Sequence, residues 1–172
     1  MNLESIKKVA IIGAGTMGLG IAQVFAQCGF ETILYDLKEA ALEKANAQIV
    51  KNLDGALKRG KIDAQGKEDT LSRLLFTNEF EALKADFILE AILENADLKI
   101  DLFKKLDAQN QANCIFATNT STIPITKIGA QIPKPERLVG VHFFNPAHIM
   151  KLVEIISGMA TGTEYAQLCF DL

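Results

Sequence analysis

One short stretch, residues 9–36, constrains the fold of this 172-residue chain more than any other. It reads VAIIGAGTMGLGIAQVFAQCGFETILYD, in which an apolar run leads into three glycines, Gly13, Gly15 and Gly18, and then into a helical pattern. Gly13 permits a tight turn, Gly15 lets the backbone approach a pyrophosphate, and Gly18 lets the helix pack closely on the strand. The N-terminus of that helix attracts phosphate charge. The stretch therefore predicts a strand–turn–helix unit that binds a dinucleotide.

The acid that follows the next strand adds to this prediction. Residues 32–35 are suited to a strand, and Asp36 comes directly after them. An acid at this distance from the glycines accepts hydrogen bonds from an adenosine ribose and would repel a 2′-phosphate, which favours NAD over NADP. Lys38 nearby weakens that preference slightly. The alternative interpretation is that the glycines serve only the turn and the packing, and that Asp36 is a solvent-facing loop acid.

Short β-branched runs alternate with helical patterns over the rest of the chain. The expected strands cover residues 9–12, 32–35, 75–77, 87–92, 114–118, 139–144 and 152–156. The expected helices cover residues 17–28, 38–59, 67–73 and 98–110, with a short helical turn after Pro124. Strand–helix alternation with near-continuously apolar strands predicts an α/β fold of the Rossmann type, with a doubly wound, mostly parallel sheet.

One connection in this pattern is unusually long. About forty residues separate the second expected strand from the third, where α/β connections commonly carry one short helix. Gly60 and Gly66 suggest two helices with a turn between them, so we expect a helical hairpin inserted between these strands. The last residues, TGTEYAQLCFDL, look like the beginning of a further helix, which suggests that the chain is part of a longer protein.

Composition narrows the class of protein further. The chain is 49% hydrophobic and 23% charged, which suits one globular domain over residues 1–172. A net charge of −3 points to neither a nucleic acid partner nor an anionic membrane surface, and no apolar run is long enough to cross a membrane. The first residues lack the apolar core of a secretory signal. Cys28, Cys114 and Cys169 form neither a zinc pattern nor a disulfide framework, which indicates a reducing compartment such as the cytoplasm.

Polar residues follow the expected strands at their carboxyl ends, where ligands bind in open α/β sheets. The three glycines follow the first strand, and Asp36 follows the second. The polar residues after the later strands are Glu94 and Lys99, then Asn119, Thr120 and Ser121, and last Asn145, with His142 just before it. Polar side chains that gather at one edge of a sheet indicate a binding site rather than a core.

His142 lies inside the apolar run LVGVHFF, which Asn145 and Pro146 end abruptly. The simplest interpretation is a core histidine that is hydrogen-bonded to backbone. Glu154 is the only acid in the following apolar run, KLVEII, and a buried carboxylate needs a partner. If the two strands are neighbours, the carboxylate would fix the imidazole tautomer, with the Ser121 hydroxyl at the same edge. A base, its orienting acid and a hydroxyl donor beside a nicotinamide are what oxidation of a secondary alcohol requires.

Four motifs together point to a known family: GAGTMG, EAILEN, NTST and HFFNP followed by MKLVE. With these spacings, between Lys8 and Glu154, the chain resembles the N-terminal NAD-binding domain of the 3-hydroxyacyl-CoA dehydrogenases. The resemblance implies that His142 is the general base, that Glu154 pairs with it, and that Ser121 hydrogen-bonds the substrate oxygen near the nicotinamide. It also implies that Asn119 helps to shape this site.

The resemblance further implies which residues contact NAD and coenzyme A. The expected NAD contacts are Gly13, Ala14, Gly15, Thr16, Met17, Gly18, Asp36, Glu94, Lys99, Ser121 and Asn145. The candidates for contacts with the coenzyme A substrate are Ser121 and, on the helical hairpin, Asn52, Lys58, Arg59 and Lys61. For the three cations, the alternative is that they complement the end of a helix and face water.

The family carries a second, mostly helical domain, and the chain as given stops before it. In the family that domain completes the acyl-CoA cleft, adds a further Asn to the site and forms most of a homodimer interface. We therefore expect NAD binding by this chain, and weak or no turnover by it alone. Three alternatives are a non-catalytic NAD-binding module, a dehydrogenase of small hydroxy acids without coenzyme A, and an interaction protein that keeps the fold.

Overall fold

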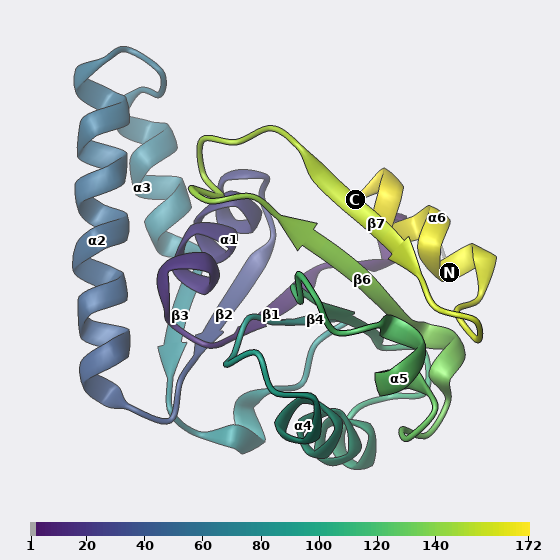
Figure 1. Ribbon diagram of the computed structural model, residues 1–172. Helices are drawn as coiled ribbons and strands as arrows, with labels where there is room; N and C mark the ends of the chain where they lie inside the picture. Colours follow the sequence, from purple (N-terminus) through teal and green to yellow (C-terminus); the bar gives the residue numbers. More distant parts are fainter. Residues whose placement is uncertain (1–2) are drawn as a thin grey trace.

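A seven-stranded sheet with helices on both faces forms the centre of the computed structural model, which describes residues 3–172 (Figure 1). The strands lie in the order β3-β2-β1-β4-β5-β6-β7. All neighbouring strands are parallel except β7, which runs antiparallel to β6. The strands are β1 Lys8–Ile12, β2 Glu31–Tyr35, β3 Leu74–Thr77, β4 Phe87–Glu90, β5 Ile115–Thr118, β6 Leu138–Phe143 and β7 Val153–Ser157. The predicted doubly wound, mostly parallel sheet is confirmed, and its order reverses between β1 and β4.

Six α-helices and three short 3₁₀ helices connect the strands of the described chain. The α-helices are α1 Thr16–Gln27, α2 Glu39–Lys58, α3 Ala64–Ser72, α4 Ala96–Gln109, α5 Ile125–Gly129 and α6 Thr163–Asp171, and the 3₁₀ helices are Leu3–Ser5, Phe80–Ala82 and Pro135–Arg137. Two helices begin earlier than predicted because a side chain caps each one. Asp63 accepts a bond from the Gly66 amide (2.7 Å), and Asn95 accepts one from the Leu98 amide (3.1 Å). Within residues 3–172, no helix combines the length and apolar character needed to cross a membrane.

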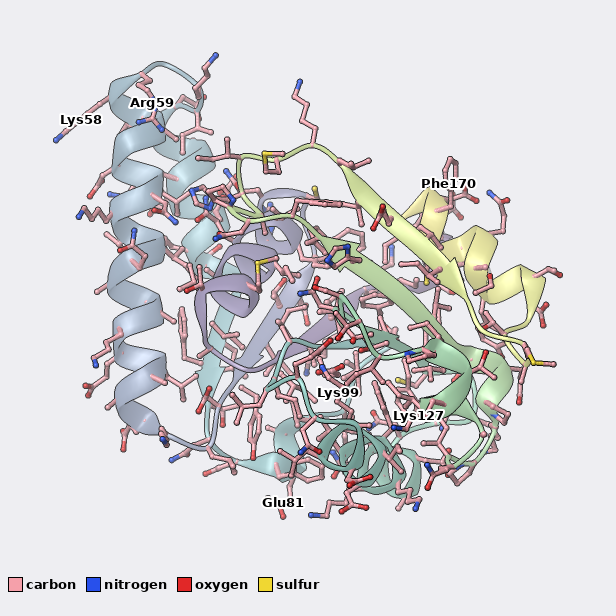
Figure 2. All side chains as sticks on the ribbon, viewed as in Figure 1. Lys58, Arg59, Glu81, Lys99, Lys127 and Phe170 are labelled. Atoms are coloured by element: carbon pink, nitrogen blue, oxygen red, sulfur yellow. The ribbon has the colours of Figure 1, made fainter. Side chains whose placement is uncertain are left out.

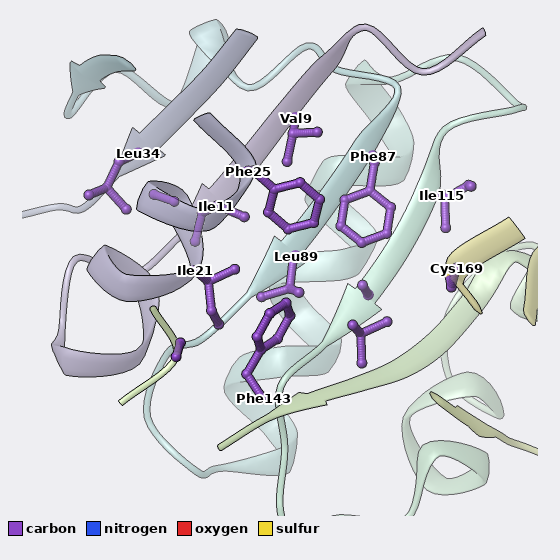
Figure 3. Packing of buried hydrophobic residues seen from close by; sticks show 14 of the residues in the cluster. Val9, Ile11, Ile21, Phe25, Leu34, Phe87, Leu89, Ile115, Phe143 and Cys169 are labelled. Carbon is purple, nitrogen blue, oxygen red and sulfur yellow. The ribbon is translucent and has the colours of Figure 1, made fainter. Parts of the chain in front are cut away.

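Alternation of side chains along the strands divides the core into two layers. One layer lies under α1, α2 and α6, and the other lies under α4 and α5. Figure 3 shows the first layer, in which Phe25 of α1 packs against Phe87 and near Phe143, with ring centroids 5.5 and 6.4 Å apart. This aromatic group holds α1 against the sheet, so the N-terminus of α1 has a fixed position at the sheet edge.

The long connection between β2 and β3 folds into a hairpin of α2 and α3. Figure 1 shows the two helices side by side at the β3 edge, with α2 extending well past the sheet. Gly60, with a φ of 65°, occupies the turn after α2. Leu42, Ile49 and Leu53 form the buried stripe of α2, so one face of this helix packs on the core while the opposite face meets solvent.

The close approach of α1 to β1 depends on two glycines. A Cβ on Gly18 would lie 1.7 Å from the Gly13 carbonyl oxygen. Gly13 itself has a φ of +102°, and a Cβ there would lie 2.7 Å from the Ala91 carbonyl oxygen. A Cβ on Gly15, by contrast, would meet nothing within 4 Å. Two of the three glycines are therefore required by the fold, and the third is not.

Gly18→Ala is expected to destabilise the protein by about 3 kcal/mol or more, because the added methyl group overlaps backbone that cannot move aside. Urea denaturation followed by circular dichroism would measure the change. Gly15→Ala is the matched control and should keep the wild-type unfolding midpoint. Equal midpoints for the two variants would contradict the close contact between Gly18 and Gly13.

Candidate active site

The turn between β1 and α1 leaves the start of α1 open to an anion. Gly15 is the N-cap residue of α1, and no side chain accepts a hydrogen bond there. The first amides of a helix without a side-chain cap are available to an outside acceptor. Because a Cβ on Gly15 would point into open space, the absence of one lets a phosphate come close to the backbone. Ala14 precedes Gly15 in this turn, and Thr16 and Met17 are the first residues of α1.

Asp36 lies beside this turn, at the end of β2. Its Oδ2 accepts a hydrogen bond from the Ala14 amide (2.9 Å), and its Oδ1 accepts one from the Lys38 amide (3.0 Å). The Gly13 amide donates to the Tyr35 carbonyl oxygen (2.8 Å), which ties the end of β2 to the same turn. The carboxylate therefore stands within reach of a ribose whose phosphate binds the turn, and the residues present fit a dinucleotide.

A groove of about 510 Å³ runs from the glycine turn to the inner face of α2. Besides residues 14–16, it is lined by Leu19, Lys44, Ala45, Gln48, Asn52, Asn145, Pro146 and His148. The peptide bond between Asn145 and Pro146 is cis. Burial and the nearby positive charge of Arg59 lower the pKa of His148. The groove thus joins the turn, the segment after β6 and the hairpin.

Ser121, His142 and Glu154 form one hydrogen-bonded chain. The Ser121 Oγ is 3.0 Å from His142 Nε2, and His142 Nδ1 is 2.8 Å from Glu154 Oε2. His142 and Glu154 are directly opposite each other in the antiparallel pair β6–β7, so the two strands are neighbours, which is the condition that their pairing requires. Glu154 is half-exposed (51%) rather than buried as expected, because β7 is the edge strand of the sheet. The His142 side chain is only 18% exposed.

Asn119 joins the ends of three strands next to His142. Its amide donates to the Glu90 carbonyl oxygen (2.9 Å), and its Oδ1 accepts from the Phe143 amide (2.8 Å). Through the bond to its Oδ1, the Asn119 side chain fixes the backbone of β6 beside His142. Asn145 is exposed and lines the groove.

Glu94 holds the loop that carries Ser121. Its Oε1 accepts hydrogen bonds from the Thr120 hydroxyl (2.5 Å), the Ser121 amide (3.2 Å), and the Thr122 amide and hydroxyl (3.1 and 3.0 Å). Burial acts to raise the pKa of Glu94, but the bonds from Thr120 and Thr122 and the charge of Lys99 outweigh it and hold the pKa at about 2. Lys99 is 1% exposed and lies behind Glu94.

The four hairpin residues that are candidates for contacts with coenzyme A fall into two groups. Asn52 lines the groove, where it donates to Gln23 (3.0 Å) and accepts from Gln48 (2.8 Å). Lys58, Arg59 and Lys61 lie at the far end of α2 and in the turn after it, and all three are exposed (Figure 2). Lys58 closes the last turn of α2, which is the position at which a cation complements a helix dipole.

Several residues of the site are missing from the sequence prediction. Lys44 and Gln48 line the groove with Asn52, and their spacing of four residues on a helix was the signal that could have identified them. His148 also lines the groove and is one of only two histidines. Glu90 is the only acid in the apolar strand β4, and a single acid in an apolar strand was the signal that could have identified it.

The glycine turn and the contact chain of Ser121, His142 and Glu154 share one sheet edge, which is the arrangement of the dinucleotide-binding domain of a nicotinamide-dependent oxidoreductase. Residues 8–172 match the family model described as 3-hydroxyacyl-CoA dehydrogenase, NAD binding domain. The chain belongs to this family, and NAD is the cofactor of this domain.

Named relatives and solved structures agree with this assignment. The 3-hydroxyadipyl-CoA dehydrogenase of Escherichia coli (strain K12) is 45% identical over 167 residues, which cover 96% of this chain and 35% of that protein. The 3-hydroxybutyryl-CoA dehydrogenase of Clostridioides difficile is 42% identical over 166 residues, which cover 96% and 59%. The crystal structure of 3-hydroxybutyryl-CoA dehydrogenase from Escherichia coli K12 has a TM-score of 0.95 at 43% identity, and the match covers 97% of this chain and 36% of that one. The chain thus spans about a third of the first of these relatives and about three fifths of the second.

Glu94→Gln is expected to change how stability depends on pH. Because the pKa of Glu94 falls from an ordinary 4.5 to about 2 on folding, its carboxylate stabilises the protein above pH 4.5, and this stabilisation is lost as the pH falls toward 2. The difference in urea midpoint between the wild type and the variant should therefore be largest above pH 4.5 and shrink toward pH 2. A difference that stays constant over this range would contradict the role of the carboxylate.

Proposed function

We propose that this chain is the cofactor-binding and base-bearing part of an NAD-dependent dehydrogenase that interconverts 3-hydroxyacyl-CoA and 3-oxoacyl-CoA. The observation that carries the proposal is the contact chain from Ser121 to His142 to Glu154, at the same sheet edge as the glycine turn. The names of the relatives support the substrate class, since they act on 3-hydroxybutyryl-CoA or 3-hydroxyadipyl-CoA.

His142 is oriented to accept a proton at Nε2. The Glu154 carboxylate only accepts hydrogen bonds, so Nδ1 carries the proton in that contact and Nε2 of the neutral ring presents a lone pair. The Ser121 hydroxyl donates to this lone pair in the structure. A substrate hydroxyl between the two groups would release its proton to Nε2 while Ser121 donates to the substrate oxygen. Bound NAD supplies the acceptor for the hydride that leaves the same carbon.

The groove along α2 is the proposed place of the coenzyme A moiety. Lys44, Gln48 and Asn52 present one cationic and two amide side chains along one face of the helix. The charge of Arg59 reaches the groove, as its effect on the pKa of His148 indicates. Asn52 and Arg59 are therefore the better supported of the four hairpin candidates, while Lys58 and Lys61 remain candidates for outer phosphate contacts.

The length of the relatives supports a larger whole protein. We propose that a second, mostly helical domain completes the acyl-CoA cleft and forms a homodimer, since this chain spans 35% and 59% of the first two relatives. The thiols of Cys28, Cys114 and Cys169 are free, which agrees with a reducing compartment such as the cytoplasm.

Gly15→Ala is expected to weaken NADH binding by about tenfold or more, a loss of about 1.4 kcal/mol, because its methyl group would occupy the space that the pyrophosphate needs. Isothermal titration calorimetry of this chain with NADH would measure the change. The variant should keep the wild-type unfolding midpoint, so the loss would be specific to binding. Unchanged NADH affinity would show that the glycine turn is not part of the cofactor site.

His142→Gln tests the catalytic proposal in the full-length protein. Loss of the base should lower the turnover of acetoacetyl-CoA and NADH by about 10²- to 10⁴-fold while NADH affinity stays the same. A spectrophotometric assay of NADH oxidation and a titration on the same sample give the two values. Wild-type turnover by the variant would show that His142 is a core residue and not the base. NADH binding by a wild type without any turnover would instead support a non-catalytic NAD-binding module.

A further inference from the structure

Glu90 is a buried carboxylate that the proposed reaction does not use. It ends β4 and is 0% exposed. Its Oε1 accepts hydrogen bonds from Lys99 Nζ (2.8 Å) and the Thr118 hydroxyl, and its Oε2 accepts from Lys99 Nζ (2.8 Å) and the Ile92 amide (3.2 Å). Burial raises the pKa of Glu90, and the Lys99 ammonium and the Thr118 hydroxyl oppose that rise. Every group that faces the two oxygens is a donor, so the contacts fit an ionised carboxylate.

Lys99, which is labelled in Figure 2, contacts both Glu90 and Glu94. An ammonium group has three protons, and three carboxylate oxygens surround this one. They are both oxygens of Glu90, at 2.8 Å, and Oε2 of Glu94, at 3.4 Å. The Lys99 side chain is 1% exposed, so its ammonium is held among these oxygens and away from solvent. The direct contact between Lys99 and NAD that the family resemblance implies stays a prediction.

The two oxygens of Glu94 have different partners. Oε2 faces the Lys99 ammonium, whereas Oε1 accepts every hydrogen bond that Glu94 receives from residues 120–122. Ser121 lies in the middle of this loop, and its hydroxyl contacts His142 Nε2. A continuous set of contacts thus runs from the buried end of β4 to the proposed base.

We propose that Glu90 is a positioning residue, which holds Lys99 and through it Glu94, so that the loop 119–122 keeps the Ser121 hydroxyl on His142 Nε2. The role rests on the proposed function of Ser121 and His142. A positioning role also explains why an ion pair is buried here. For stability alone, a well-packed apolar pair would often serve equally well.

The charge balance of the network explains why the loop depends on Glu90. The Lys99 ammonium now shares its protons between two carboxylates, mostly with Glu90. Without the charge of Glu90, the buried ammonium has only Glu94 as its anionic partner. Glu94 would then turn toward Lys99, and the amides of Ser121 and Thr122 would lose their acceptor. Thr118 Oγ1, which accepts from the Thr120 amide (3.3 Å), would lose its carboxylate partner at the same time.

Three variants separate positioning from stability. Glu90→Gln removes the charge, and the double variant Glu90→Gln/Lys99→Met removes both buried charges, so that it folds even if the single variant does not. Asp107→Asn is the matched control, because Asp107 pairs with the fully buried Arg137 and lies near the other end of α4 from Lys99. All three change a buried ion pair, but only the first two touch the network that reaches Ser121.

Amide hydrogen exchange of the whole chain, followed by NMR, is the first measurement. The amides of Ser121 and Thr122 should exchange about fivefold faster or more in Glu90→Gln and in the double variant, while amides of β1 and β5 keep the wild-type rate. Asp107→Asn should leave the two loop amides unchanged relative to the rest of the protein. Wild-type protection of these amides in the double variant would overturn the proposal, and so would equal acceleration by Asp107→Asn.

A double-mutant cycle with Ser121→Ala in the full-length protein is the second measurement. Glu90→Gln should lower turnover by about tenfold in the wild type but by less than about twofold in the Ser121→Ala background, because its effect passes through Ser121. Equal losses in both backgrounds would overturn the positioning role. A wild type without turnover would contradict the proposed function alone, because the exchange rates measure the loop independently of the reaction.

Discussion

The contact between Gly18 and Gly13 is the constraint on which the rest of the site depends. A Cβ on Gly18 would overlap the Gly13 carbonyl oxygen at 1.7 Å, so α1 can lie this close to β1 only with a glycine at that position. The close approach puts the first turn of α1 over the edge where the parallel strands end. Asp36, Glu94, Asn119 and the Ser121 loop follow strands that end at the same edge. A shift of α1 would therefore separate the glycine turn from the contact chain of Ser121, His142 and Glu154.

Four carboxylates lie along this edge, and protein donors hold each of them. Asp36 accepts from backbone amides beside the glycine turn, and Glu90 and Glu94 share Lys99, while Glu154 accepts from His142. A buried carboxylate needs donors, because desolvation penalises its charge. Glu90, at 0% exposure, has four bonds, whereas half-exposed Glu154 needs only one. These donors fix the orientation of each carboxylate and offset the repulsion between the negative charges.

Prediction from the sequence succeeded where the local pattern of a segment favours the same secondary structure that the folded chain gives it. The strands lie within about two residues of their expected positions, since apolar runs of β-branched residues form strands wherever a sheet can bury them. It was wrong at the end of β4, because the Ile92 amide bonds the Glu90 side chain rather than a neighbouring strand. It was also wrong about the burial of Glu154, because the edge position of β7 follows from strand order, which hydrophobic periodicity does not encode.

The alternation of strands and helices, the glycine turn with its acid, and the residue types that follow each strand can all be predicted from the sequence alone. Those features depend on neighbours within a few residues, where backbone sterics and side-chain periodicity act directly. The pairing of His142 with Glu154 across β6 and β7, and the burial of Lys99 between two carboxylates, become visible only in the folded chain. These pairings join residues that are distant in sequence, and they form because burying an ionised group requires a partner that only the assembled sheet brings within reach.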